Sequence, residues 1–206
     1  MNTLLRNLVG ATVLVGATTV ITTQVVSQDP GQPDMEEMMA AWMKLGAPGP
    51  EHAKMAQAEG KWTQVVKHWM YPGAEPETSE SIAEFRPILG GRYMIQKMTG
   101  SMEMMGEPME FEGFGLFGYD NFTKKHFFVW ADSMSTMLMA AEGTADASGN
   151  VITYYSEMPN PMTGETMKFK SVSTTISDDK QKFEMFEQTP DGGWHRNMEL
   201  VAKRSK

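Results

Sequence analysis

Methionines are the side chains whose number and spacing come closest to a chemical motif. The chain has 21 of them in 206 residues, and it has no cysteine. Two groups are dense: Met35, Met38, Met39 and Met43, and then Met98, Met102, Met104, Met105 and Met109. Closely spaced thioethers are soft ligands that favour Cu(I). The first group also has the spacing of an apolar helix face, and the second lies on a strand entering a hairpin. Packing in a core or a lid is therefore our interpretation, and Cu(I) binding is the alternative.

Groups that would point to catalysis or to a resident metal are scarce. None of the histidines His52, His68, His126 and His195 stands two or four residues from another, so the sequence contains no local metal motif. Asp132 and Ser133 are adjacent, but no strained Gly-x-Ser-x-Gly turn accompanies them, and we interpret them as turn formers. The absence of cysteine excludes disulfides and thiolate chemistry. The sequence shows no catalytic constellation and predicts neither an enzyme nor a metal site.

The N-terminus has the pattern of a secretory signal peptide. Arg6 lies in a short basic region, and the uncharged apolar stretch 8–26 follows it. Small residues before Gln28 predict cleavage there, so residues 1–27 are assigned to a signal peptide and the mature protein to the periplasm or the exterior. A retained single-span anchor is the alternative, since about 19 apolar residues can cross a bilayer.

Two short helices are expected before the main domain. Asp34 can cap a helix whose Met and Trp42 side chains recur at helical spacing and which Gly46 and Pro48 end. We assign residues 28–48 to a linker and this helix. A second helix is expected from Pro50 to Ala58, at the start of a single domain that spans residues 49–206.

From Lys61 onward the pattern is that of an antiparallel meander. Turn signals recur about every dozen residues, between runs rich in β-branched and aromatic residues. Strands are predicted at Lys61–Met70, Thr78–Ile88, Arg92–Met104, Met109–Tyr119, Lys125–Ser133, Thr136–Ala145, Val151–Met158, Glu165–Ser177, Gln181–Gln188 and Trp194–Lys203. Successive hairpins favour a closed up-and-down barrel of about ten strands, because closure removes exposed edges. A β-sandwich is the alternative. Gly113, Gly115 and Gly118 are expected to relieve crowding within a strand.

Composition limits the partners. The charged residues comprise 18 Lys and Arg against 26 Asp and Glu, a formal net charge of -8. This balance argues against nucleic acid and against an anionic membrane surface, both of which attract basic patches. With the signal peptide removed, no stable membrane partner is expected.

The start and end of the meander resemble the calycin group, which includes lipocalins and fatty-acid-binding proteins. Gly60 and Trp62 open the first strand, and Lys203 and Arg204 end the last one. The resemblance implies that Trp62 closes one barrel end and that Arg204 or Lys203 packs across its ring.

A longer set of motifs resembles the exported bacterial family called domain of unknown function 1579. The matching residues are Gly49-Pro50-Glu51-His52, Gly60-Lys61-Trp62, Pro72-Gly73, Leu89-Gly90-Gly91-Arg92, Gly118-Tyr119-Asp120-Asn121, Asp132-Ser133-Met134-Ser135-Thr136, Pro161-Met162-Thr163-Gly164, Pro190-Asp191-Gly192 and Met198-Glu199. The resemblance implies an all-β, calycin-like barrel with N-terminal helices. It implies no activity and no functional residues.

These observations lead to a binding hypothesis. An exported barrel of this size can enclose a small, largely apolar ligand, with the helix of Met35 to Met43 near a barrel mouth. The candidate cavity residues are Phe111, Phe117, Tyr119, Phe128, Trp130, Met137, Met139, Tyr154 and Phe169. No cofactor is required by the sequence. The alternatives are a scaffold or protein-interaction module without a ligand, a Cu(I)-binding protein, and a haem protein that uses His195 on the last strand.

Overall fold

The computed structural model describes residues 34–104 and 107–206. The predicted signal peptide and its cleavage site lie outside these residues. The chain divides after Met39, and the second unit, Ala40–Lys206, contains the barrel. Within the described ranges no helix has the length and apolar character needed to span a bilayer.

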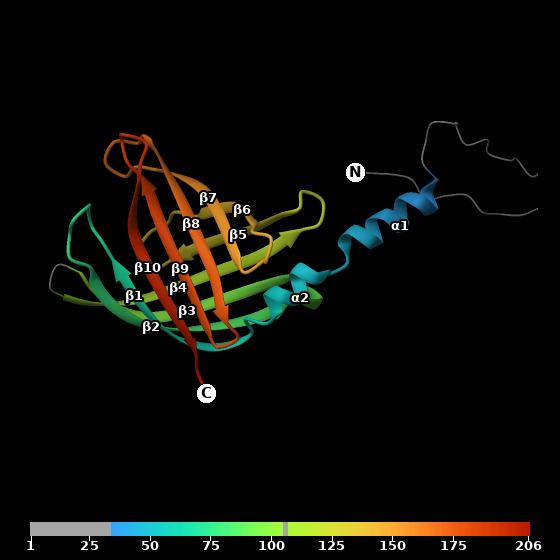
Figure 1. Cartoon of the computed structure of the whole chain (residues 1–206), viewed down its shortest axis with the longest axis horizontal. Helices are drawn as coiled ribbons and strands as arrows, with labels where there is room; N and C mark the ends of the chain where they lie inside the picture. Colours follow the sequence, from blue (N-terminus) through green and yellow to red (C-terminus); the bar gives the residue numbers. More distant parts are fainter. Residues whose placement is uncertain (1–33, 105–106) are drawn as a thin grey trace, which may run out of the picture. The chain divides into compact units, whose positions relative to one another are not determined.

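The described strands form one closed antiparallel barrel, in which each strand pairs with its sequence neighbours and the first pairs with the last (Figure 1). Its strands are β1 (Gly60–His68), β2 (Glu77–Ile88), β3 (Tyr93–Met104), β4 (Glu107–Asp120), β5 (Lys125–Asp132), β6 (Met139–Ala145), β7 (Val151–Pro159), β8 (Thr166–Ser177), β9 (Lys180–Gln188) and β10 (Trp194–Arg204). This confirms the predicted closed up-and-down barrel.

The strand boundaries agree with the sequence prediction within two residues, except at the start of β6. The prediction began this strand at Thr136, whereas β6 begins at Met139. Side chains hold the preceding backbone in a loop, because the Met134 amide donates to Asp132 Oδ1 at 3.0 Å and the Met137 amide donates to Ser135 Oγ at 3.2 Å. Such local bonds compete with strand pairing.

The two helices differ from the sequence prediction in their packing. α1 (Met35–Gly46) and α2 (Pro50–Ala56) form where expected. However, α1 has no buried residue, so its methionines do not pack in a core, and packing as a lid, the other half of that interpretation, stays a prediction. Trp42 remains 62% exposed, although its ring meets Phe122 of the β4–β5 turn edge-on at 5.6 Å. The expected place of α1 near a barrel mouth stays a prediction.

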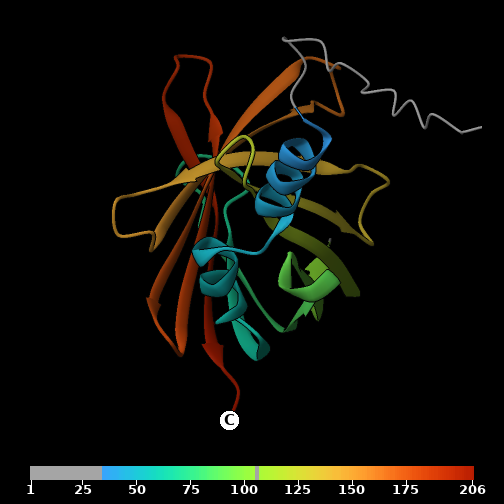
Figure 2. The ribbon, with the colours of Figure 1, turned by 90° about the vertical axis from the view of Figure 1, so that its right-hand side faces the viewer.

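α2 lies across the barrel end at which β1 begins and β10 ends (Figure 2). Lys54 Nζ donates to the Ser148 carbonyl in the β6–β7 turn, and Trp62 Nε1 donates to the Ala58 carbonyl just after the helix. Arg92 and Asn121 donate to the carbonyls of Leu45 and Gly46 at the end of α1 and of Ala47 just after it. Side-chain hydrogen bonds from four parts of the chain therefore fix α2 and its flanking segments to this end.

Trp62 and Arg204 join the first strand to the last at the same end. Trp62 is completely buried, and the Arg204 guanidinium carbon lies 4.3 Å from its ring centroid. Arg204 also donates to the Glu59 carbonyl at 2.6 Å and to the Gln57 carbonyl at 2.7 Å. Gly60 has a positive φ of 119°, and a Cβ there would lie 3.3 Å from Arg204 Nη1. Of the two basic residues considered from the sequence, Arg204 makes the contact.

Substituting Trp62 and Arg204 tests this closure. Trp62→Ala is expected to lower the free energy of unfolding by about 3–5 kcal/mol, because a fully buried ring is lost. In a double-mutant cycle with Arg204→Ala, urea unfolding should give a coupling energy of about 0.5–3 kcal/mol. Lys203→Ala is the control and should change stability by less than about 0.5 kcal/mol. Additive losses would show that the two residues do not interact.

Candidate functional site

Strand register fixes which side chains point into the barrel. Successive residues of a strand point to opposite faces, and directly paired residues share a face. Buried residues such as Trp62 on β1, Phe128 on β5 and Phe169 on β8 mark the inner face. By the same register, the inner face includes Phe111, Phe117, Tyr119, Phe128, Trp130, Met139, Tyr154 and Phe169. Met137, the ninth candidate, lies instead in the loop before β6 and is exposed.

Aromatic rings cover two glycines on the inner face of β4. A Cβ at Gly113 would lie 2.4 Å from the Trp130 ring, and one at Gly115 would lie 2.6 Å from the Phe117 ring. Trp130 Nε1 donates to Asp132 Oδ2 at 2.9 Å, and Phe111 stacks on the Trp130 ring. The glycines therefore relieve crowding as predicted. Because glycine has no side chain, the flat rings lie against the barrel wall and leave space near the barrel axis.

Phe128 joins rings from several strands inside the barrel. Its ring centroid lies 5.9 Å from Phe117, 5.0 Å from Tyr154 and 6.2 Å from Phe183. Phe128, Ala141 and Tyr154 form the buried centre of this cluster. Burial raises the pKa of the Tyr154 hydroxyl far above its ordinary value, so this group stays neutral. The inward-facing Phe183, Met185 and Leu200 are only partly buried, which shows that side chains do not fill the interior.

The barrel wall is incompletely paired between β6 and β7. These strands pair only where Glu142–Ala145 faces Ile152–Tyr155. Residues Met139–Ala141 of β6 pair with β5 alone, and Ser156–Pro159 of β7 pair with β8 alone, among the described strands. We call the space between these two half-strands the β6–β7 gap.

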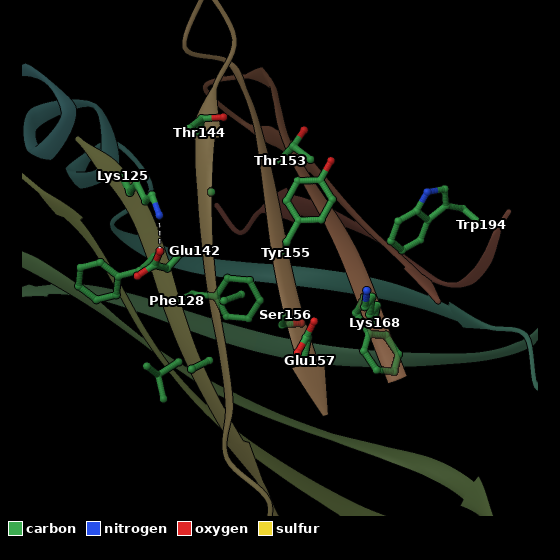
Figure 3. Close-up of a pocket in the computed structure, with 16 residues that line it drawn as sticks. Lys125, Phe128, Glu142, Thr144, Thr153, Tyr155, Ser156, Glu157, Lys168 and Trp194 are labelled. Carbon is green, nitrogen blue, oxygen red and sulfur yellow. Dashed lines mark hydrogen bonds and ion pairs between the residues drawn. The ribbon is translucent and has the colours of Figure 1, made fainter. Parts of the chain in front are cut away.

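A cavity of about 850 Å³ lies at this gap, and its lining residues are drawn in Figure 3. Its lining includes the inner-face residues Phe128, Ala141, Ser156 and Phe169, and also outer-face residues such as Tyr155. Most lining residues point outward by register, whereas Phe128, Ala141, Ser156 and Phe169 are inner-face residues less than 10% exposed. The cavity therefore opens on the outer surface and borders buried inner-face residues at the gap.

Charged and aromatic side chains surround the outer opening of the cavity. Lys125 and Glu142 form an exposed ion pair at 2.6 Å, drawn as a dashed line in Figure 3. Glu157, Lys168 and Trp194 complete this rim. Exposed ion pairs contribute little stability, so the rim charges can rearrange at low cost when a molecule enters.

Four buried polar atoms on β7, β8 and β10 have no hydrogen-bond partner. They are Ser156 Oγ, Ser171 Oγ, His195 Nε2 and Asn197 Oδ1. Ser156, Ser171 and His195 face inward by register, and Asn197 is the extra residue where the β9–β10 register shifts. The two serines and the asparagine were not predicted from the sequence. Each serine stands two residues from an aromatic candidate, Tyr154 or Phe169, and so shares its face, but the sequence did not determine which face points inward.

Histidines at the α2 end form a second, smaller cluster. The His52 ring meets Tyr119 edge-on at 5.9 Å, and Tyr119 lies 4.8 Å from His126. His126 Nε2 lies 3.7 Å from Glu51 Oε2. Burial lowers the pKa of His126, while the Glu51 carboxylate partly opposes this effect. A cavity of about 370 Å³ adjoins His52 and Tyr119.

The other chemical candidates from the sequence serve structural roles or stay apart. Asp132 orients Trp130 and the following loop, and Ser133 Oγ accepts from the Glu112 amide, as expected for turn formers. No three His, Asp or Glu residues of the described chain are arranged to hold a metal ion. In the second methionine group Met98 is buried and Met102 pairs with Met109, while Met105 lies outside the described residues.

Comparison with protein families identifies the chain. The family model described as "Protein of unknown function (DUF1579)" matches residues 47–204. The chain belongs to this family. The DUF1579 match begins at the segment that Arg92 and Asn121 tie to the barrel and ends at Arg204, so it covers α2 and the whole barrel. No curated protein matches the sequence.

Solved structures show the same fold at low sequence identity. This DUF1579 chain is similar to Rv2717c from M. tuberculosis, with a TM-score of 0.54 and 14% identity over 78% of this chain and 100% of that one. It is also similar to the S-type phycobiliprotein lyase CPES from Guillardia theta, with a TM-score of 0.50 and 12% identity over 84% of this chain and 99% of that one. These likenesses concern the barrel fold alone.

Two histidines predict a pH dependence of stability. Desolvation lowers the pKa of the buried His126 and, although its side chain is exposed in part, that of His68, so below the ordinary value of 6.5 the unfolded chain binds more protons. The free energy of unfolding should therefore fall between about pH 7.5 and about pH 5.5, where the carboxylates stay ionised. Urea unfolding should show a smaller fall for His126→Gln. Greater stability at the lower pH would contradict this assignment.

Proposed function

We propose that this protein binds a small, largely apolar molecule in the cavity that opens through the β6–β7 gap. The observation that carries the proposal is the lining of this cavity, in which the buried rings of Phe128 and Phe169 lie beside the single polar inner residue Ser156. A volume of about 850 Å³ falls within the range of small-molecule sites, which are mostly apolar with a few placed polar groups.

The β6–β7 gap supports the proposal because it gives a ligand a route into the barrel. A ligand enclosed by ten continuously paired strands would have to displace an end of the barrel to enter. Here the half-strands Met139–Ala141 and Ser156–Pro159 lack pairing toward each other, so entry breaks no ladder hydrogen bond. The proposed setting is extracytoplasmic, as the signal-peptide pattern of residues 1–27 predicts.

Native mass spectrometry of the protein purified from the periplasm tests this function. We expect a mass increment that is released on denaturation and that corresponds to an organic molecule. A haem or copper increment would instead support the haem or Cu(I) alternative. A mass equal to the chain alone, together with no binding of apolar probes, would contradict the proposal and favour a protein-interaction module.

Two phenylalanine substitutions test the location of the site. Ser156→Phe places a ring in the cavity, whereas Thr78→Phe places the same ring on the outer face of β2, outside the cavity lining. We expect Ser156→Phe to weaken binding of the neutral fluorescent probe N-phenyl-1-naphthylamine roughly tenfold or more, because the ring occupies the ligand's volume. Thr78→Phe should leave the affinity within about twofold. Fluorescence titration measures both, with circular dichroism to verify folding. Equal affinities in both variants would place the probe elsewhere.

A further inference from the structure

We propose that the ligand carries a neutral hydroxyl or amide group, and that Ser156 and Ser171 bind this group while the apolar body lies against Phe128 and Phe169. This inference rests on the proposed function: Ser156 lines the same cavity, and Ser171 lies beside it on β8, two residues from the lining residue Phe169. It assigns the ligand's chemical class from the polar atoms that the barrel buries.

The two serines lie close together on neighbouring strands. Ser156 of β7 pairs directly with Phe169 of β8, and Ser171 is the next inward residue along β8. The two serines are therefore diagonal neighbours, which in antiparallel sheets are about 7–8 Å apart at the backbone. Their hydroxyls can reach one polar group held between them, next to the Phe169 ring.

The burial of these hydroxyls indicates a missing partner. Ser171 is 1% exposed and Ser156 is 7% exposed, yet neither Oγ has a hydrogen bond. Buried polar groups are almost always hydrogen-bonded, because burying one without a partner costs stability. Ser81, also 7% exposed, follows this rule, since its hydroxyl donates to Gln64 Oε1 at 3.1 Å. The barrel thus satisfies a buried serine on β2 and leaves the two on β7 and β8 for another molecule.

The surrounding groups favour a neutral ligand that can donate a hydrogen bond. A serine hydroxyl both donates and accepts hydrogen bonds, so a ligand group that can donate to it satisfies the buried Oγ atoms of Ser156 and Ser171. The carboxyl side chain of Glu187 faces inward and pairs directly with both Phe169 and His195. A carboxylate or phosphate on the ligand would be repelled by this acidic side chain. The described lysines of the cavity, Lys125 and Lys168, lie on the outer rim of the cavity and not beside the serines. An alcohol or an amide is neutral and can donate a hydrogen bond, so it meets both requirements.

Three probes that share the naphthalene ring system test the chemical class of the ligand's polar group: naphthalene, 1-naphthol and 1-naphthoate. Each competes against the neutral fluorescent probe N-phenyl-1-naphthylamine on the full-length mature protein. We expect 1-naphthol to bind roughly tenfold tighter than naphthalene, since only it satisfies the buried hydroxyls, and tighter than 1-naphthoate. Equal affinities for naphthalene and 1-naphthol, or a preference for 1-naphthoate, would overturn the inference while leaving the proposed function intact. If none of these probes binds, the proposed function itself fails.

Serine substitutions assign the preference to specific residues. Ser156→Ala and Ser171→Ala, singly and combined, should reduce the naphthol-to-naphthalene ratio toward one while naphthalene still binds. Ser171→Ala should not lower the melting temperature, because it removes a hydroxyl without a partner. Ser81→Ala is the matched control and should lower the melting temperature while leaving the ratio unchanged, because its hydroxyl is bonded within the protein. An unchanged naphthol-to-naphthalene ratio in the Ser156 and Ser171 variants would overturn the assignment. A fall of this ratio in Ser81→Ala as large as in those variants would overturn it too.

Discussion

Closure of the sheet between β1 and β10 is the constraint on which the rest of the structure depends. These strands are the ends of the meander, more than a hundred residues apart, and their pairing leaves no terminal edge. Trp62 and Arg204 form the first pair of this ladder, and the guanidinium binds carbonyls on both sides of it. Because Trp62 also bonds to the Ala58 carbonyl, the same contact anchors the segment after α2. One cation–aromatic pair thus links strand closure to the covering of one barrel end.

In this closed barrel, the β6–β7 gap interrupts the pairing of the wall. If the register of the paired part continued, Met139–Ala141 would face Ser156–Met158, but the described ladders pair these residues only with β5 and β8. β6 itself begins after a loop held by Asp132 and Ser135. Asp132 also orients Trp130 on the inner face, so one carboxylate shapes both the aromatic wall and the loop before the gap. The apolar interior, the unpaired half-strands and the buried serines are consequences of the same strand arrangement.

Much of the fold was predictable, because turn chemistry and period-two patterning specify strands locally. The glycine and aspartate turns placed nearly every strand, and Gly60 and Trp62 indicated the closure. The late start of β6 was not predictable, since Thr136 to Leu138 have strand-like composition and the side-chain bonds of Asp132 and Ser135 hold this segment in a loop. The gap was not predictable either, because it lies between residues of β6 and β7 that were both predicted as strand. The inner face was likewise undetermined from sequence, because a shift of one residue exchanges the faces. Ser171 could therefore not be recognised as buried until Phe169 was known to point inward.

The most direct test of the central claim, that the barrel holds a small apolar molecule reached through the β6–β7 gap, is a crystal structure of the protein soaked with 1-bromonaphthalene. Anomalous scattering locates the bromine independently of the protein coordinates. The account predicts an anomalous peak inside the barrel, in contact with Phe128 and Phe169 and beside Ser156. Bromine peaks confined to the outer surface, with side chains filling the space between these two rings, would contradict it.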